Sequence, residues 1–245
     1  MTPLYKILIS GSTVWAKMEN QNPTGTHKDR SMERWILNFA KASARELAIS
    51  SSGNSAISAA KYCRENNIKL NVFLSPSVDR EKIERLRPYT NIILHLTKTP
   101  NKDAFRFCKK NNVPNLRASK DDMALEGYRD IARELTEQLP QIDNIFIPIS
   151  SGATLEGMYQ GYCMTTTPSP FFVRRGVDVP RFYAVQTTNV HPIASYFDKD
   201  FTEEKTSRAT AIVDRVAHRR NRVIRIIKET RGGGFVISNA ELEEA

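Results

Sequence analysis

Short apolar runs alternate with longer stretches of amphipathic, helical character along most of the chain. The apolar runs predict β-strands at Ile68–Leu74, Asn91–Leu96, Asn144–Ile149, Phe182–Gln186 and Gly234–Ser238. The stretches between them predict helices at Asn54–Asn66, Lys102–Lys110, Met123–Gln138, Leu155–Met164 and Arg219–Thr230. Because strands and helices take turns, we expect an α/β fold with a mostly parallel sheet.

One lysine, Lys28, stands at the junction between a turn and a helix. Two turn-forming pairs, Asn-Pro and Thr-Gly, occupy residues 22–25, and the run from Asp29 through Ala48 has helical character with no Pro or Gly. At a helix start, the positive end of the helix dipole and any loss of hydration disfavour the ammonium form of a lysine. Such an amine can attack an aldehyde and form a Schiff base. The alternative is a surface lysine that follows a loop.

Two further loops join a strand to a helix and offer groups that bind anions. Residues 150–154 read Ser-Ser-Gly-Ala-Thr, so backbone N–H groups, small side chains and a positive helix end surround one point, which suits a phosphate. Residues 52–55 read Ser-Gly-Asn-Ser after a short strand, which suits an α-carboxylate. Ordinary capped helix starts are the alternative for both loops.

Composition and charge narrow the class of protein. Of 245 residues, 40% are hydrophobic, which allows one large or two modest domains, and no apolar run approaches the roughly 20 residues that span a bilayer. The three cysteines are widely spaced, so we expect buried thiols and neither a disulfide framework nor a metal site. The formal charge of +9 attracts phosphorylated metabolites, and nucleic acid only non-specifically.

From these features we expect a soluble protein, cytoplasmic by default, with no membrane or specific nucleic-acid partner. The segment Thr165–Pro180 carries three prolines and the pair Phe171-Phe172, and is expected to be an ordered crossing loop or a partner contact.

Four motifs follow one another along the chain. They are E-x-x-N-P-T-G-T-H-K-D-R at residues 19–30, S-S-G-N-S at 51–55, E-G-Y-R-D-I-A-R-E-L at 126–135 and P-I-S-S-G-A-T-L at 148–155. In this order they resemble the motifs of the fold-type II pyridoxal-phosphate enzymes, most closely the threonine synthases. The resemblance extends from Thr2-Pro3-Leu4 to the G-G-G-F-V-I-S run that ends at Ser238, nearly the whole chain.

The resemblance implies a two-domain fold like that of the tryptophan synthase β-subunit, with open, twisted, mostly parallel sheets and helices on both faces. A small domain, residues 35–140, would be inserted into a large domain built from residues 1–34 and 141–245. The cofactor, pyridoxal 5'-phosphate, would lie between them. The residues implied to form the site are Lys28 for the Schiff base, Asn54 for the cofactor's ring hydroxyl oxygen, Ser52, Gly53 and Ser55 for the substrate carboxylate, and Ser150, Ser151, Gly152, Ala153 and Thr154 for the cofactor phosphate.

The reaction implied is that of a lyase of amino-acid biosynthesis. It converts O-phosphohomoserine to threonine and phosphate, while Lys28 moves protons at Cα and Cβ and the cofactor ring stores electrons. One alternative is a cysteine synthase or a threonine or serine dehydratase. Another is a non-catalytic remnant of the fold that acts as a binding protein.

The chain departs from the family pattern at several places. His27 stands where the family has an aromatic residue and is expected to pack, with a substrate or phosphate contact as the alternative. Ser150 and Ala153 replace glycines and Thr154 replaces asparagine, which could misshape the phosphate loop. Family members also continue beyond Ala245, into segments that complete the sheet and supply a partner to the pyridine nitrogen.

Three explanations of the short C-terminal end stay open at this point. They are a truncated chain or broken gene, a split enzyme completed by another chain, and a short family member that dimerises. We expect a homodimer or a completing chain, with weak threonine-forming activity in the isolated chain.

Overall fold

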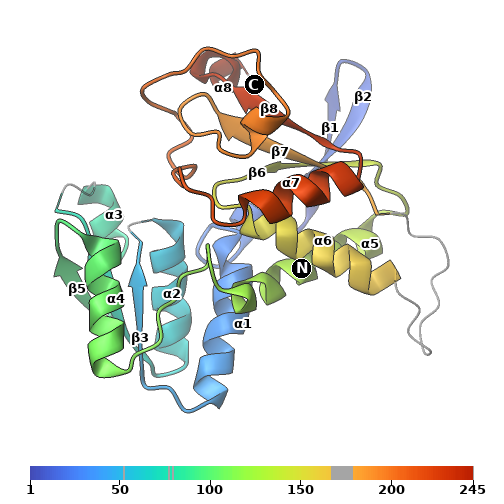
Figure 1. Cartoon of the computed structure of the whole chain (residues 1–245). Helices are drawn as coiled ribbons and strands as arrows, with labels where there is room; N and C mark the ends of the chain where they lie inside the picture. Colours follow the sequence, from blue (N-terminus) through green and yellow to red (C-terminus); the bar gives the residue numbers. More distant parts are fainter. Residues whose placement is uncertain (52, 77, 79, 167–178, 245) are drawn as a thin grey trace. The chain divides into compact units, whose positions relative to one another are not determined.

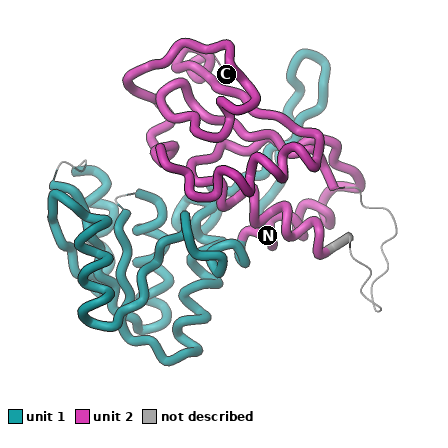
Figure 2. Tube along the Cα trace, viewed as in Figure 1, with its two compact units in different colours: residues 1–127 teal, residues 128–245 magenta. Residues whose placement is uncertain are grey.

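The computed structural model describes residues 1–51, 53–76, 78, 80–166 and 179–244 (Figure 1). The chain forms two compact units, unit 1 with residues 1–127 and unit 2 with residues 128–245 (Figure 2). The expected crossing loop or partner contact at Phe171-Phe172 lies outside the described residues. The division into a small domain, residues 35–140, and a discontinuous large domain stays a prediction.

Unit 1 contains a hairpin followed by a three-stranded parallel sheet. Strands β1 and β2 pair antiparallel, and the parallel sheet has the order β3-β4-β5. The elements are β1 (Leu4–Ile9), β2 (Ser12–Lys17), the 3-10 helix η1 (Glu19–Gln21), α1 (Lys28–Lys41), β3 (Glu46–Ser50), α2 (Asn54–Glu65), β4 (Lys69–Leu74), α3 (Arg80–Glu84), β5 (Ile92–Leu96), α4 (Pro100–Asn111), the 3-10 helix η2 (Asp122–Leu125) and the start of α5 (Glu126–Gln138).

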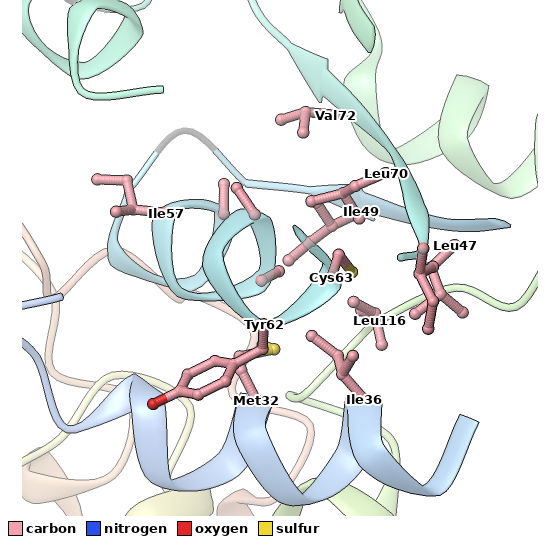
Figure 3. Packing of buried hydrophobic residues seen from close by; sticks show 14 of the residues in the cluster. Met32, Ile36, Leu47, Ile49, Ile57, Tyr62, Cys63, Leu70, Val72 and Leu116 are labelled. Carbon is pink, nitrogen blue, oxygen red and sulfur yellow. The ribbon is translucent and has the colours of Figure 1, made fainter. Parts of the chain in front are cut away.

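Alternate residues of the β3-β4-β5 sheet face different helices, as the two-residue period of a strand requires. One face packs against α2, and α2 lies between this sheet and α1 (Figure 3). The buried strand residues on that face are Leu47, Ile49, Leu70, Val72 and Leu74. Ala48 and Phe73 on the other face pack against α4. Because both faces of β3 and β4 are buried, these two strands appear in the sequence as nearly continuous apolar runs.

The helical run expected from Asp29 through Ala48 is wrong in its second half. Helix α1 ends at Lys41, and Ser43 then adopts a left-handed conformation with φ 60°. The chain enters β3 at Glu46, where Leu47 and Ala48 are both fully buried. Burial on both faces of a parallel sheet outweighs the weak helix preference of this short segment.

Unit 2 contains a second three-stranded parallel sheet, in the order β6-β7-β8. Tyr159 and Tyr162 of α6 meet Phe182 of β7 edge-on, with ring centroids 6.2 and 6.0 Å apart, and α7 also packs on β7. The elements are the remainder of α5, β6 (Asn144–Pro148), α6 (Ala153–Thr166), β7 (Arg181–Thr187), the 3-10 helix η3 (Ala194–Tyr196), α7 (Arg220–Glu229), β8 (Gly233–Ile237) and α8 (Asn239–Glu244).

The sheet of unit 2 carries three neighbouring aromatic rings, from Phe146, Tyr183 and Phe235. Phe146 stacks on Tyr183 with ring centroids 4.6 Å apart, and Phe235 lies 6.0 Å from each of them. Tyr183 alternates along β7 with the buried Phe182 and Ala184, so these rings lie on the sheet face opposite to that of Phe182. We call these three residues the aromatic face.

The predicted α/β class with parallel sheets is confirmed, and each predicted strand and helix overlaps an observed one. The hairpin β1–β2 and the short helices α3 and α8 were not predicted. Across the described residues, no helix combines the length and the apolar character needed to cross a bilayer.

Candidate functional site

Lys28 is the first residue of α1, as predicted. The loop before it turns at Gly25, whose φ is +78° and whose N–H donates to the carbonyl of Asn22 at 2.8 Å. The backbone N–H of Lys28 then donates to the hydroxyl of the buried Thr26 at 3.2 Å. The backbone of Lys28 is therefore fixed on both sides, by this turn and by α1.

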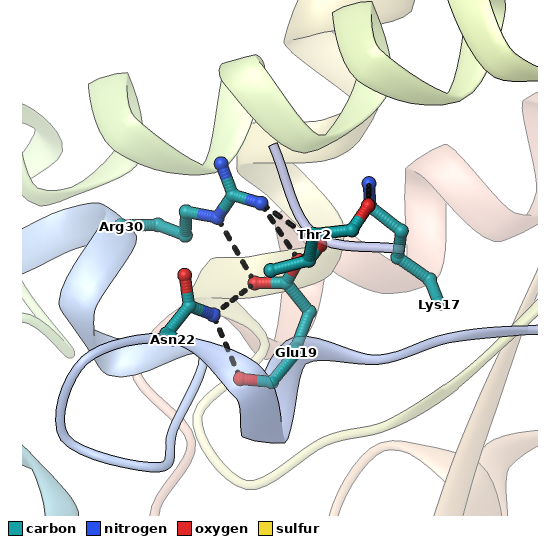
Figure 4. A network of polar contacts seen from close by, with 5 residues as sticks. All are labelled: Thr2, Lys17, Glu19, Asn22 and Arg30. Carbon is teal, nitrogen blue, oxygen red and sulfur yellow. Dashed lines mark hydrogen bonds and ion pairs between the residues drawn. The ribbon is translucent and has the colours of Figure 1, made fainter. Parts of the chain in front are cut away.

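A network of polar side chains anchors the same loop at its beginning (Figure 4). Glu19 accepts hydrogen bonds from Arg30 at 2.9 and 3.1 Å, from Thr2 at 2.6 Å and from Asn22 at 2.9 Å. Lys17 donates to the carbonyl of Thr2 at 2.7 Å. Burial raises the pKa of Glu19, but the hydrogen bonds from Arg30, Thr2 and Asn22 outweigh it, so the pKa is lowered overall. Glu19 therefore stays ionised, and its carboxylate joins Thr2 and Asn22 to Arg30 in α1.

Asp29, next to Lys28, is 1% exposed and accepts three hydrogen bonds. The backbone N–H and the hydroxyl of Thr24 donate to it at 2.7 and 2.6 Å, and the hydroxyl of Ser58 in α2 donates at 2.6 Å. The carboxylate thus connects the turn, α1 and α2. Neither Asp29 nor Ser58 was among the predicted site residues. The sequence feature that could have indicated this contact is Ser58, a polar residue inside the apolar run 56–60.

His27 immediately precedes Lys28. Burial, and then the positive charge of Lys28, lower the pKa of His27 well below its usual value. The imidazole is therefore neutral at pH 7 and offers no positive charge to a phosphate. This agrees with the expectation that His27 packs in place of an aromatic residue.

The predicted carboxylate loop leads into α2, which begins at Asn54. Gly53 has φ −117°, and a Cβ built on it would meet no atom within 4 Å. Asn54 and Ser55 are the first two residues of α2 and are partly buried. Ser52 lies outside the described residues.

The predicted phosphate loop joins β6 to α6 in unit 2. Gly152 has φ +88°, which favours glycine, whereas neither Ser150 nor Ala153 has a positive φ. Ala153 is 2% exposed, so its methyl group packs inward. The residues that replace the family's glycines therefore leave the loop unstrained. As in any helix, the first N–H groups of α6 have no acceptor within the helix.

Ser150 and Glu156 hold this loop in place. The hydroxyl oxygen of Ser150 accepts the N–H groups of Val213 and Asp214 at 3.1 and 3.0 Å, which leaves its own hydrogen to donate. Glu156, in the first turn of α6, binds the buried Arg219 at 2.9 Å and Arg222 at 3.3 Å. Two guanidinium groups on one carboxylate leave a net positive charge, which favours an anion. This cluster was not predicted from the sequence.

Lys28, Gly53, Asn54 and Ser55 all belong to unit 1. The loop of residues 150–154 belongs to unit 2. Both parts fit the expected cofactor: an amine at a fixed helix start with the amide of Asn54 in the same unit, and a glycine-containing loop of N–H donors for a phosphate. The assignment of the individual site residues stays a prediction.

Other chemistries have less support among the described residues. Burial raises the pKa of the Cys63 thiol to about 12 and that of Cys108 to about 11, which suits buried packing residues and not nucleophiles. No group of three or more His, Cys, Asp or Glu side chains in the described ranges is arranged to hold a metal ion.

The chain is similar in sequence to two enzymes of known activity. The threonine synthase of Methanocaldococcus jannaschii is 24% identical over 261 residues, which cover 100% of this chain and 63% of that protein. The L-serine dehydratase/L-threonine deaminase of Homo sapiens is 26% identical over 162 residues, which cover 62% of this chain and 48% of that protein. The alignments thus span between about half and two-thirds of the length of these relatives.

The fold is that of solved fold-type II structures. The structure of maize serine racemase superposes with a TM-score of 0.79 at 18% identity, covering 100% of this chain and 73% of that chain. The family model described as "Pyridoxal-phosphate dependent enzyme" matches residues 1–245. The resemblance to fold-type II enzymes, and with it pyridoxal 5'-phosphate as the cofactor, is confirmed. The chain belongs to the family of pyridoxal-phosphate dependent enzymes.

Proposed function

We propose that this protein is a threonine synthase-like lyase that converts O-phosphohomoserine and water to threonine and phosphate. The observation that supports this most is the way in which the lysine motif is built. Hydrogen bonds among the residues of this motif, and with their neighbours, fix the start of α1, where Lys28 stands. The residues that make them are Glu19, Asn22, Thr24, Asp29 and Arg30. The match to threonine synthase over the whole chain adds to this support.

Each group of residues has a separate task in the proposed reaction. Lys28 binds the cofactor through its amine, and later takes and returns protons at Cα and Cβ of the substrate. Asn54 donates to the ring hydroxyl oxygen, and Gly53, Ser55 and Ser52 bind the substrate carboxylate. The N–H groups of residues 150–154 bind the cofactor phosphate. When bound, pyridoxal phosphate supplies the electron sink for charge that develops at carbon.

The test of Lys28 is chemical. Borohydride reduction in the presence of pyridoxal phosphate should leave a stable pyridoxyl group on Lys28, which peptide mapping locates. Lys41, at the opposite end of α1, is the matched control for non-specific labelling. A label on Lys41 or elsewhere, with none on Lys28, would remove Lys28 from the proposed site.

The substrate is tested separately, because the human dehydratase match favours a second reaction. With O-phosphohomoserine we expect threonine and phosphate in equal amounts. With serine or threonine, a dehydratase would instead release ammonia and a keto acid. If neither reaction nor β-replacement by sulfide occurs although Lys28 is labelled, the chain is a cofactor-binding protein without this activity.

A further inference from the structure

The contact between α1 and α2 is largely apolar and includes the buried carboxylate of Asp29. Met32, Trp35 and Ile36 of α1 pack into the cluster that contains Ala59 and Ala60 of α2. The hydrophobic effect that stabilises contacts of this kind has no preferred direction. The hydrogen bond between Ser58 and Asp29 is directional, and it fixes where α2 lies along α1.

The two ends of this hydrogen bond are next to residues of the proposed site. Asp29 follows Lys28 directly in α1. Ser58 lies four residues after Asn54, so both side chains share one face of α2, about 6 Å apart along its axis. The two other hydrogen bonds of Asp29 hold the turn before Lys28 through Thr24. The Asp29 carboxylate is therefore bonded both to the turn that precedes Lys28 and to the helix that carries Asn54.

Stability alone does not account for a carboxylate at this place. Removing a charge from water is costly unless hydrogen bonds replace its hydration, and apolar residues of similar size stabilise a helix contact at least as well. What the carboxylate adds is a fixed spacing between the two helices.

We propose that Asp29 is a positioning residue that, through Ser58, sets the spacing between Lys28 and Asn54 and thereby the affinity for pyridoxal phosphate. The proposal rests on the proposed function, because it takes Lys28 and Asn54 as cofactor-binding residues. Asp29 and Ser58 themselves touch neither cofactor nor substrate in this scheme. The effect of Ser58 on the cofactor must therefore pass through Asn54.

A double-mutant cycle measures this dependence. The dissociation constant for pyridoxal phosphate is determined by titration for the natural protein, Ser58→Ala, Asn54→Ala and the double variant. We expect Ser58→Ala to weaken binding at least about fivefold when Asn54 is present, and less than about twofold when Asn54 is replaced. Equal losses in both backgrounds would overturn the proposal, since a general loosening of the fold does not depend on Asn54.

Ser31→Ala is the matched control. Ser31 is also 0% exposed, and its hydroxyl donates to the carbonyl of Ala124 at 2.7 Å in the same unit. Both Ser→Ala variants should lower the urea midpoint by similar amounts, but only Ser58→Ala should change the affinity for the cofactor. A similar affinity loss in Ser31→Ala would reduce Ser58 to a structural residue.

Failure of the proposed function would have a different signature. If Lys28→Ala and Asn54→Ala leave pyridoxal-phosphate binding unchanged, the proposed site is wrong, and this proposal falls with it. If those two variants bind weakly while Ser58→Ala is additive with Asn54→Ala, only the positioning role is rejected. Should Ser58→Ala not fold, Ser58→Cys keeps the size and replaces the hydroxyl by a weak donor, and the same dependence on Asn54 is expected.

Discussion

Lys28, Asp29 and Arg30 are consecutive residues with three different tasks. Successive helix residues point about 100° apart, so the three side chains leave α1 in different directions. Asp29 meets Thr24 and Ser58, and Arg30 meets Glu19. The start of α1 is thus held by the two charged groups that flank Lys28 on its C-terminal side.

His27 makes the stability of unit 1 depend on pH. Its pKa in the folded protein is lowered, so below the unfolded value of about 6.5 the unfolded chain binds a proton that the folded chain does not. Stability is therefore complete above pH 6.5 and falls as the pH drops, by at most about 1.4 kcal/mol per pH unit. We expect His27→Phe to reduce this loss between pH 6.5 and 5, measured by urea unfolding. If His27→Phe loses as much stability between pH 6.5 and 5 as the natural protein does, His27 is not the cause of this pH dependence.

Replacement by alanine should change substrate binding at Gly53 but stability at Gly127. A Cβ on Gly53 meets open space, so Gly53→Ala should leave the unfolding free energy nearly unchanged but raise the KM for the amino-acid substrate. A Cβ on Gly127 would lie 1.7 Å from the carbonyl oxygen of Arg30, so Gly127→Ala should destabilise the protein by about 1–3 kcal/mol. If Gly53→Ala alters neither quantity, this loop does not approach the substrate.

The position of Lys28 could be predicted because its signals are local: turn pairs before it and a helical pattern after it. The bond between Asp29 and Ser58 could not, because it joins residues of two helices that only the packed fold brings together. The cluster of Glu156 with Arg219 and Arg222 is hidden for the same reason, since the charges come from α6 and α7.

At the scale of elements, the sequence predicted where strands and helices occur better than where they end. The polar-to-apolar changes at β4 and β6 place each start within one residue of the prediction. The boundary between α1 and β3 was missed because neither Pro nor Gly marks it. The turn there uses the left-handed Ser43, which no local preference requires.

The loop between β6 and α6 allows a test of the phosphate site. Gly152 has φ +88°, and a Cβ there would lie 2.6 Å from Cγ2 of Val223, so Gly152→Val must disturb the loop. We expect this variant to lose affinity for pyridoxal phosphate several-fold more than for pyridoxal, which lacks the phosphate.

The comparison of both ligands on one variant corrects for any general loss of stability. Thr154→Ala, which removes a hydroxyl without adding volume, should show a smaller effect in the same direction. Equal losses for the two ligands in both variants would place the phosphate elsewhere.

At the scale of the whole molecule, family membership could be inferred from the order of the four motifs, because three of them mark a strand-to-helix or turn-to-helix junction and the fourth, residues 126–135, lies within α5. What the sequence could not provide is the distribution of apolar surface. Phe146 is 57% exposed and Phe235 is 45% exposed, although both lie in strands. Period-two patterns show which residues share a sheet face, but not whether that face is covered.

The expected association of two copies of the chain follows from this surface. Contiguous exposed apolar groups on a folded protein mark a contact site or cause aggregation, and the aromatic face of unit 2 is such a group. We therefore expect sedimentation to report a dimer or a larger species, and Phe235→Lys to shift it toward monomer, because a charge in the contact would lose its hydration. The matched control is Phe105→Lys in α4 of unit 1, where the side chain is 60% exposed and is not part of the aromatic face, and it should leave association unchanged. If the natural protein sediments as a monomer at micromolar concentration, the aromatic face does not join two copies. If both Phe→Lys variants shift the protein toward monomer, the association is non-specific.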